Sequence, residues 1–226
     1  MPNYCTNVVK APKEVLEEIF DGKKATFQKI IPMPKTLNLV ESGRKDEAVL
    51  YAIFCKEKDT MQKLITLLKN TKEHFYNSYW DMLQKTYSLE TIDKLEEKAR
   101  LFIPNTEEKE LGIKSFEELG DVYLNNLLKY KSMTWYDWSI ENWGTKWDAV
   151  DSEGTPKDRE LRFLTAWAEP IPIIKKLFEK YPKMKIEWEY ELEGEEYSGK
   201  YISDGKGKIT KEEYVIQVEE DEEDEI

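Results

Sequence analysis

The chain has 226 residues, of which 40% are apolar and 35% charged, and its formal net charge is −12. A chain of this length and composition can bury a core, as one large domain or two small ones, without disulfide staples. The acidic balance disfavours nucleic acid as a partner, because phosphates are repelled, and favours a protein with a basic surface.

The residue types that hold metals and disulfides are scarce. The sequence contains two cysteines and one histidine: Cys5, Cys55 and His74. A disulfide framework or a four-ligand zinc site needs more than these, so neither a metal nor another cofactor is expected. The first residues have no signal-peptide pattern, and no apolar run approaches the ~20 residues that span a bilayer. We therefore expect a cytoplasmic protein without membrane contact.

The N-terminal residues predict one β-α-β unit. Residues 3–9 are β-prone, and residues 13–20 carry apolar side chains at 15, 16, 19 and 20, the stripe of an amphipathic helix. Pro12 suits the first turn of this helix, and Gly22 suits its C-terminal cap. Residues 27–31 are predicted as the second strand, which the prolines at 32 and 34 end.

Residues 35–133 are predicted to be a helical insertion. Amphipathic patterns cover residues 46–58, 60–83 and 89–102. Ser115 and Glu118 have the spacing of a capping box, which predicts a helix from there to about residue 130. Insertions into a small fold often carry what is specific to one protein, so this segment is a candidate for the particular function.

The C-terminal half predicts a second β-α-β unit. Residues 161–167 form a strand, residues 170–181 a helix that Pro182 ends, and residues 184–190 a strictly alternating strand. Two such units make a ferredoxin-like α+β domain, a four-stranded antiparallel sheet with two helices on one face. Residues 196–202 and 213–218 extend it as a hairpin. The predicted organisation is a ferredoxin-like domain at 1–34 and 134–218, a helical insertion at 35–133 and a disordered acidic tail at 219–226.

Four separated motifs resemble one family. They are residues 1–7 (MPNYCTN), 27–34 (FQKIIPMP), 138–149 with the run WGTKWDA at its end, and 163–170 (FLTAWAEP). In this order they resemble the YubB-like ferredoxin-domain proteins of phages and plasmids, over about residues 1–34 and 133–203. The resemblance implies a ferredoxin-like fold, a mobile-element origin and thus the cytoplasm of a bacterial host. It implies no catalytic residues, and two cysteines could not hold an iron–sulfur cluster.

Tryptophan is concentrated just after the predicted insertion. Trp135, Trp138, Trp143 and Trp147 lie within thirteen residues, and Trp167 and Trp188 follow. Such rings form hot spots for proteins or stacking platforms for bases, so Trp135, Trp138 and Trp143 are candidate partner-binding residues. The alternative is that they seal the insertion onto the sheet. Gly144, inside this block, is expected to permit a turn that a side chain would block.

The acidic tail is a second candidate contact, because a polyanion can compete for the basic groove of a nucleic-acid-binding protein. The alternative is that the tail binds no partner and only keeps the protein in solution. The residues concerned are Glu219, Glu220, Asp221, Glu222, Glu223, Asp224 and Glu225.

The remaining chemical residues favour structural roles. His74 has no nucleophile placed near it by sequence, and both cysteines are predicted to be small core residues. Residues 204–208 (DGKGK) lack the P-loop pattern and favour a hairpin turn. Asp148, Asp151 and Asp158 could hold a hard cation, but their spacing fits no metal-binding loop.

Three functions compete. The first is a phage-type counter-defence protein that inhibits or sequesters a basic host protein, such as a CRISPR nuclease or another nucleic-acid-handling defence enzyme, without being an enzyme itself. The second is a nucleic-acid-binding accessory protein, which requires Trp167 or Trp188 to be exposed on the sheet beside lysine or arginine. The third is an enzyme in which distant carboxylates converge beside basic residues in a pocket.

Overall fold

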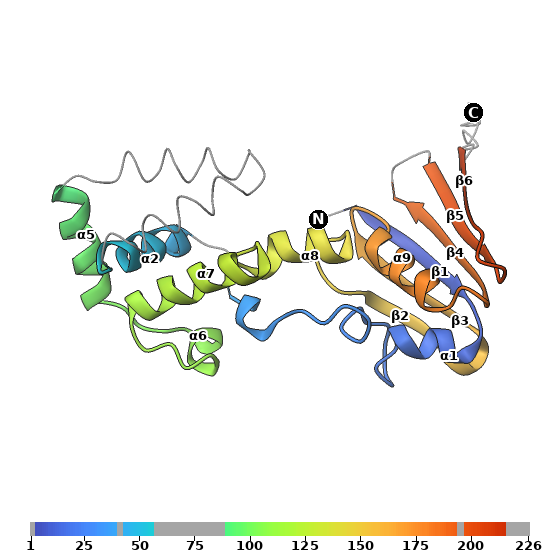
Figure 1. Ribbon diagram of the computed structural model, residues 1–226, viewed down its shortest axis with the longest axis horizontal. Coiled ribbons are helices and arrows are strands. Elements are labelled where there is room, and N and C mark those ends of the chain that lie inside the picture. Colours follow the sequence, from blue (N-terminus) through green and yellow to red (C-terminus); the bar gives the residue numbers. More distant parts are fainter. Residues whose placement is uncertain (1–2, 40–42, 57–88, 194–196, 216–226) are drawn as a thin grey trace, which may run out of the picture. The chain divides into compact units, whose positions relative to one another are not determined.

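The computed structural model describes residues 3–39, 43–56, 89–193 and 197–215. The chain divides into two compact units. Unit 1 comprises residues 1–33 and 139–226, and unit 2 comprises residues 34–138. Figure 1 labels the helices and strands of both units.

Unit 1 is a ferredoxin-like α+β domain, as the sequence predicts. Its six-stranded antiparallel sheet has the order β2-β3-β1-β4-β5-β6. The strands are β1 (Tyr4–Lys10), β2 (Val150–Thr155), β3 (Glu160–Ala166), β4 (Lys185–Leu192), β5 (Tyr197–Asp204) and β6 (Ile209–Val215). The first four strands, with β1 and β3 in the centre, give the arrangement expected of two interleaved β-α-β units. The β5–β6 hairpin is added at the β4 edge.

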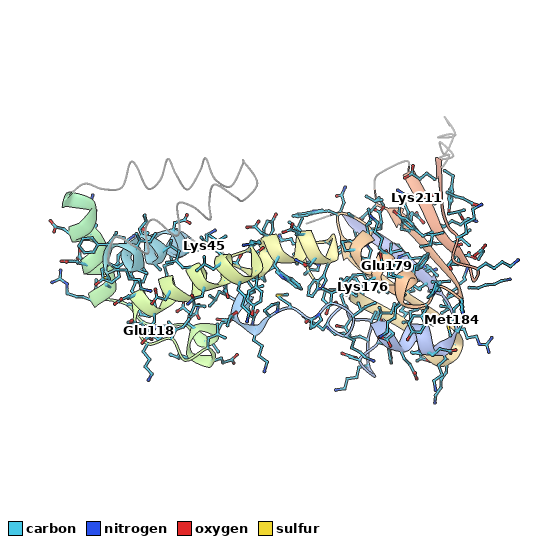
Figure 2. All side chains as sticks on the ribbon, viewed as in Figure 1. Lys45, Glu118, Lys176, Glu179, Met184 and Lys211 are labelled. Atoms are coloured by element: carbon cyan, nitrogen blue, oxygen red, sulfur yellow. The ribbon has the colours of Figure 1, made fainter. Side chains whose placement is uncertain are left out.

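Helices cover one face of this sheet. They are α1 (Lys13–Leu16), continued by the short 3₁₀ helix η1 (Glu17–Ile19), and α9 (Ile171–Lys180), all on the near side in Figure 1. The apolar stripe of α9 is buried, while Lys176 and Glu179 lie on its exposed side (Figure 2). The strands alternate between buried and half-buried residues, so their period of two aligns one face with the helices. The core contains edge-to-face pairs between Phe163 and Trp188, at 5.6 Å, and between Phe27 and Phe163, at 5.9 Å.

The prediction of a strand at residues 27–31 is wrong. These residues form a turn in which the N–H groups of Ile30 and Ile31 donate to the carbonyl of Phe27. The second strand of the ferredoxin-like order is β2, which lies after the insertion. The insertion therefore separates α1 from β2 within the first β-α-β unit, rather than separating the two units. The physical reason is that the Phe27 N–H is taken by the Asp148 carboxylate, at 2.7 Å, and is unavailable to a strand.

The C-terminal hairpin is confirmed, but its second strand begins four residues earlier than predicted, at Ile209. The predicted turn follows β5, where the Asp204 carboxylate accepts from the N–H groups of Lys206 and Lys208. Gly205 and Gly207 adopt φ values of 72° and 91°, which glycine reaches without steric cost. The acidic tail at 219–226 lies outside the described residues.

Unit 2 contains helices. They are η2 (Lys35–Leu37), α2 (Gly43–Phe54), α5 (Leu89–Arg100), α6 (Thr106–Glu110) and α7 (Phe116–Tyr130); α8 (Trp135–Trp143) begins in unit 2 and ends in unit 1. The predicted helices at 46–58, 89–102 and 115–130 correspond to α2, α5 and α7. The predicted helix at 60–83 and His74 lie outside the described residues. None of the described helices is long and apolar enough to cross a membrane.

The packing of α2 against α7 depends on Gly120. A Cβ at this position would lie 2.0 Å from the carbonyl oxygen of Ala48, so no larger residue fits between the two backbones. Ser115 caps α7, as predicted, by accepting from the N–H of Glu118 at 3.1 Å. The return bond of the capping box is absent, because the Glu118 carboxylate accepts from the N–H of Lys114 instead.

Candidate partner-binding surface at the end of β3

The segment before β2 is bonded to the end of β3 by buried polar groups. The hydroxyl of Thr145 donates to the carbonyl of Ala166, at 2.9 Å, and accepts from the same residue's N–H, at 3.0 Å. Gly144 has φ 81°, and a Cβ there would lie 2.7 Å from Pro172, so the predicted turn indeed requires glycine. The Ser139 hydroxyl donates to the carbonyl of Lys146, at 2.6 Å. Together these bonds hold the backbone from which the side chains of Lys146 and Trp147 extend.

Trp167 follows β3 in an unusual backbone conformation. Its φ is 70°, a left-handed value that bulky residues rarely adopt and that costs of the order of 1–2 kcal/mol. The N–H of Trp167 donates to the carbonyl of Asn3, at 3.0 Å, which continues the β1–β3 ladder and holds the residue in place. Its side chain is 45% exposed, one of the large apolar side chains that the described part of the chain leaves open.

Lys146 lies between two indole rings. Its Nζ is 4.8 Å from the ring centroid of Trp147 and 4.8 Å from that of Trp167. A cation over an indole face gains about 0.5–2 kcal/mol, depending on its exposure to water. The arrangement orders both rings and leaves part of Trp167 open to solvent. We call Lys146, Trp147 and Trp167 the indole–lysine surface.

Chemically, this surface can hold a flat or cationic group. An exposed indole stacks on a guanidinium, a base or another ring, and tryptophan is enriched among the residues that dominate protein interfaces. Because Lys146 already orders Trp167, less side-chain entropy is lost when a partner binds.

The three tryptophans predicted from the sequence as partner-binding residues are not members of this surface. Trp143 is buried: its indole N–H donates to the carbonyl of Ile31, at 2.9 Å, and its ring meets Phe27 edge-on. Trp138 is also buried, and Trp135 is half-buried with its ring 5.6 Å from that of Tyr136. A buried ring exposes little of its face to a partner, and partner binding by Trp135, Trp138 and Trp143 stays a prediction. The tail residues 219–225 lie outside the described residues.

Other predicted residues have structural contacts. Trp188 is buried and donates to the side-chain oxygen of Asn7, at 3.0 Å. Asp148 accepts from the Thr26 hydroxyl as well as from Phe27. Cys5 is buried, and burial raises the pKa of its thiol to about 12. The prediction that Cys55 is a core residue is wrong, because this residue follows the last turn of α2 and is exposed. Within the described ranges, no group of three metal-ligating side chains is present.

A cleft of about 600 Å³ in unit 1 brings carboxylates and lysines together. Its lining includes Glu17, Asp21 and Lys29. The ammonium of Lys29 donates to the carbonyls of Glu17, the first residue of η1, and of Phe20, which follows η1. Two backbone N–H groups, those of Lys24 and Lys23, hold the pKa of Asp21 below its usual value. A carboxylate of this kind stays ionised at neutral pH and is not suited to be a general acid.

A match to a protein-family model agrees with the fold of unit 1. Residues 142–226 match a family model described as "Ferredoxin-like domain in Api92-like protein". A crystal structure of the protein api92 from Yersinia pseudotuberculosis is similar at 12% sequence identity, with 95% of this chain and 98% of that chain covered, and a TM-score of 0.37. None of the curated proteins searched matches the sequence. The matched family residues include the whole indole–lysine surface together with β2 to β6.

Proposed function

We propose that this protein is a non-catalytic binding protein, and that its partner is a host protein with a basic surface. The observation that carries the proposal is the indole–lysine surface, in which Trp167 is held exposed against a backbone preference. Strain of this kind persists only where the surrounding structure imposes it, and it is concentrated at binding and catalytic sites. An arginine of the partner would stack on the open face of Trp167, and the net charge of −12 would steer a basic protein toward it.

We also propose where the protein comes from and which host protein it binds. The resemblance of the four motifs to the YubB-like proteins of phages and plasmids supports a mobile-element origin. A basic host partner in that setting is a nucleic-acid-handling defence enzyme, such as a CRISPR nuclease, which the protein would inhibit or sequester in the bacterial cytoplasm. Such enzymes have basic grooves for nucleic acid, so an acidic protein is a suitable competitor.

A comparison of three tagged proteins tests this function. Wild type, Trp167→Ala and Leu101→Ala are used to capture partners from lysates of hosts with and without a CRISPR system, and each is co-expressed in a phage-plaque assay. Leu101 is a matched control, since it is 72% exposed but belongs to unit 2. We expect a stoichiometric basic partner and restored plaques with wild type and Leu101→Ala, and loss of both with Trp167→Ala. No partner in any host, or equal capture by Trp167→Ala, would refute the proposal.

A nucleic-acid-binding accessory protein is the second candidate, because Trp167 is exposed beside Lys146. An indole that stacks on a base and a lysine near a phosphate form a minimal single-strand site. Titration with a twelve-nucleotide single strand at low salt distinguishes the two functions. Quenching of tryptophan fluorescence that is lost in Trp167→Ala would favour this second candidate, whereas the first predicts no binding.

A further inference from the structure

The two edges of the unit 1 sheet differ in regularity. The β2 edge has a register shift between Val150 and Glu153, and Asp151 and Gly154 adopt positive φ values. Bulges of this kind protect an edge from pairing with another strand. The β6 edge pairs with β5 in unbroken register over seven residues. Figure 1 shows β6 as the outermost strand of the sheet.

The hydrogen-bond pattern fixes which backbone groups of β6 point outward. The N–H of Asp204 donates to the carbonyl of Lys208, at 3.2 Å, so this pair is hydrogen-bonded. Bonded and non-bonded pairs alternate in an antiparallel ladder. The backbone groups of Thr210, Glu212 and Tyr214 therefore point toward β5, and those of the intervening residues 209, 211, 213 and 215 point away from it. The outward groups have no strand partner within the described chain.

The side chains of β6 show what the edge would accept. Ile209 and Tyr214 are each 47% exposed, and they lie near opposite ends of the strand and on opposite faces of the sheet. Between them are the carboxylates of Glu212 and Glu213, whose side chains are 56% and 61% exposed; Glu212 pairs with Lys200, at 3.3 Å, and Glu213 with Lys211. A strand added at this edge would meet apolar side chains near both ends of β6 and carboxylates in its middle.

Lys211 offsets part of the charge of these carboxylates, and its ammonium lies on the helix-covered side of the sheet. Its ammonium pairs with Glu213 and with Glu169, the latter at 3.8 Å, and lies 5.7 Å and 5.3 Å from the ring centroids of Tyr190 and Tyr201. Figure 2 labels Lys211 on β6. From residue 209 to the C-terminus the sequence has nine carboxylates and this one lysine.

We propose that the β6 edge binds an extended basic segment of the partner, which adds to the sheet as a seventh strand. Backbone hydrogen bonds supply affinity in this mode of recognition, and alternating side chains supply specificity. Lysine or arginine opposite Glu212 and Glu213 matches the charge. A second copy of this chain is a poorer match, because antiparallel pairing of β6 with itself, centred on Glu212, would place the Glu212 carboxylates of the two copies opposite each other. This inference rests on the proposed function, which supplies the expectation that the partner is basic. It concerns the β6 edge, whereas the proposed function concerns the indole–lysine surface.

A synthetic peptide tests the edge without the natural partner. The full ¹⁵N-labelled chain is titrated at low salt with an eight-residue peptide of alternating valine and lysine, and with a matched valine–glutamate peptide. We expect shifts and slower hydrogen exchange at the amides of Lys211 and Glu213 with the lysine peptide only. Shifts confined to other strands, equal effects of both peptides, or a dimer formed through β6 without peptide would overturn the proposal.

Two variants give independent checks. Glu213→Pro removes an outward N–H and no bond to β5, and it should abolish binding. If this variant unfolds, the double change Glu212→Lys and Glu213→Lys should weaken binding about tenfold, since two surface ion pairs become two repulsions. Trp167→Ala should bind the peptide as wild type does. If the edge proposal fails, the β6 variants will bind the peptide as well as wild type does. If the proposed function fails, the failure will appear in the capture and plaque assays instead.

Discussion

Replacing Asp148 with alanine is expected to destabilise unit 1 by about 2–4 kcal/mol. The carboxylate accepts from the Thr26 hydroxyl and the Phe27 N–H, both at 2.7 Å, and from the Ala149 N–H at 2.9 Å. A hydrogen bond to a charged group contributes about 1.5–3 kcal/mol, and a buried donor left alone costs about 1–3 kcal/mol. The three bonds share one half-buried carboxylate, so their contributions overlap rather than add.

Asp21 provides a matched control. Its carboxylate also accepts from two backbone N–H groups, of Lys23 and Lys24 at 2.8 and 2.9 Å, but it is exposed. Asp21→Ala should therefore change stability little, since water replaces the lost bonds. Native-state hydrogen exchange of the β1 and β3 amides measures unit 1 separately from unit 2. Equal effects of the two substitutions, or a loss below about 1 kcal/mol for Asp148→Ala, would refute the reasoning.

Three further outcomes are expected. Gly120→Ala should lower the stability of unit 2 by about 3 kcal/mol, because its Cβ would overlap the Ala48 carbonyl, and exchange of the α7 amides measures this. Ser115→Ala should cost about 1 kcal/mol in the same assay through loss of the cap on the Glu118 N–H. Burial raises the pKa of the Cys5 thiol from 9.0 to about 12, so this thiol ionises at a lower pH in the unfolded chain than in the folded one. The contribution of the protonated thiol to the stability of unit 1 is therefore fully present below pH 9 and is lost as the pH rises toward 12. Urea unfolding between pH 8 and 11 should show this decline, and it should be shallower in Cys5→Ala.

Strong periodicity in the sequence is enough to predict the central elements. The alternation of β4 and the apolar stripe of α9 come directly from burying one face, so both were found within a few residues of their observed ends. The sequence does not predict β2, because its residues, VDSEGT, have little strand propensity and the strand forms by pairing with β3. The predicted strand at residues 27–31 is wrong because a short apolar run fits a strand and a packed turn equally well. The group that decides between them, Asp148, is 121 residues away from Phe27.

The candidate site could be predicted only in part. Tryptophan content marked the region after the insertion, but no local pattern distinguishes the buried Trp143 from the exposed Trp167. Their difference arises from tertiary contacts: Trp143 packs on Phe27, whereas the left-handed backbone at Trp167 turns its ring outward. The β6 edge is likewise a property of strand order, which the hairpin prediction did not specify.

The motifs behind the family resemblance meet in one hydrogen-bonded junction. The N–H of Trp167 donates to the carbonyl of Asn3, and the indole N–H of Trp143 donates to that of Ile31. The hydroxyl of Thr145 bonds to the backbone of Ala166, which links these two pairs, so all four segments are joined. Most of these side chains bond to the chain's own backbone, and such residues specify the fold rather than a shared partner. The exposed ring of Trp167 is the exception, because its packing accounts for only part of its surface. Two proteins with the same junction therefore share a scaffold, and a common partner would have to be shown by substitution of Trp167 and of β6 in each.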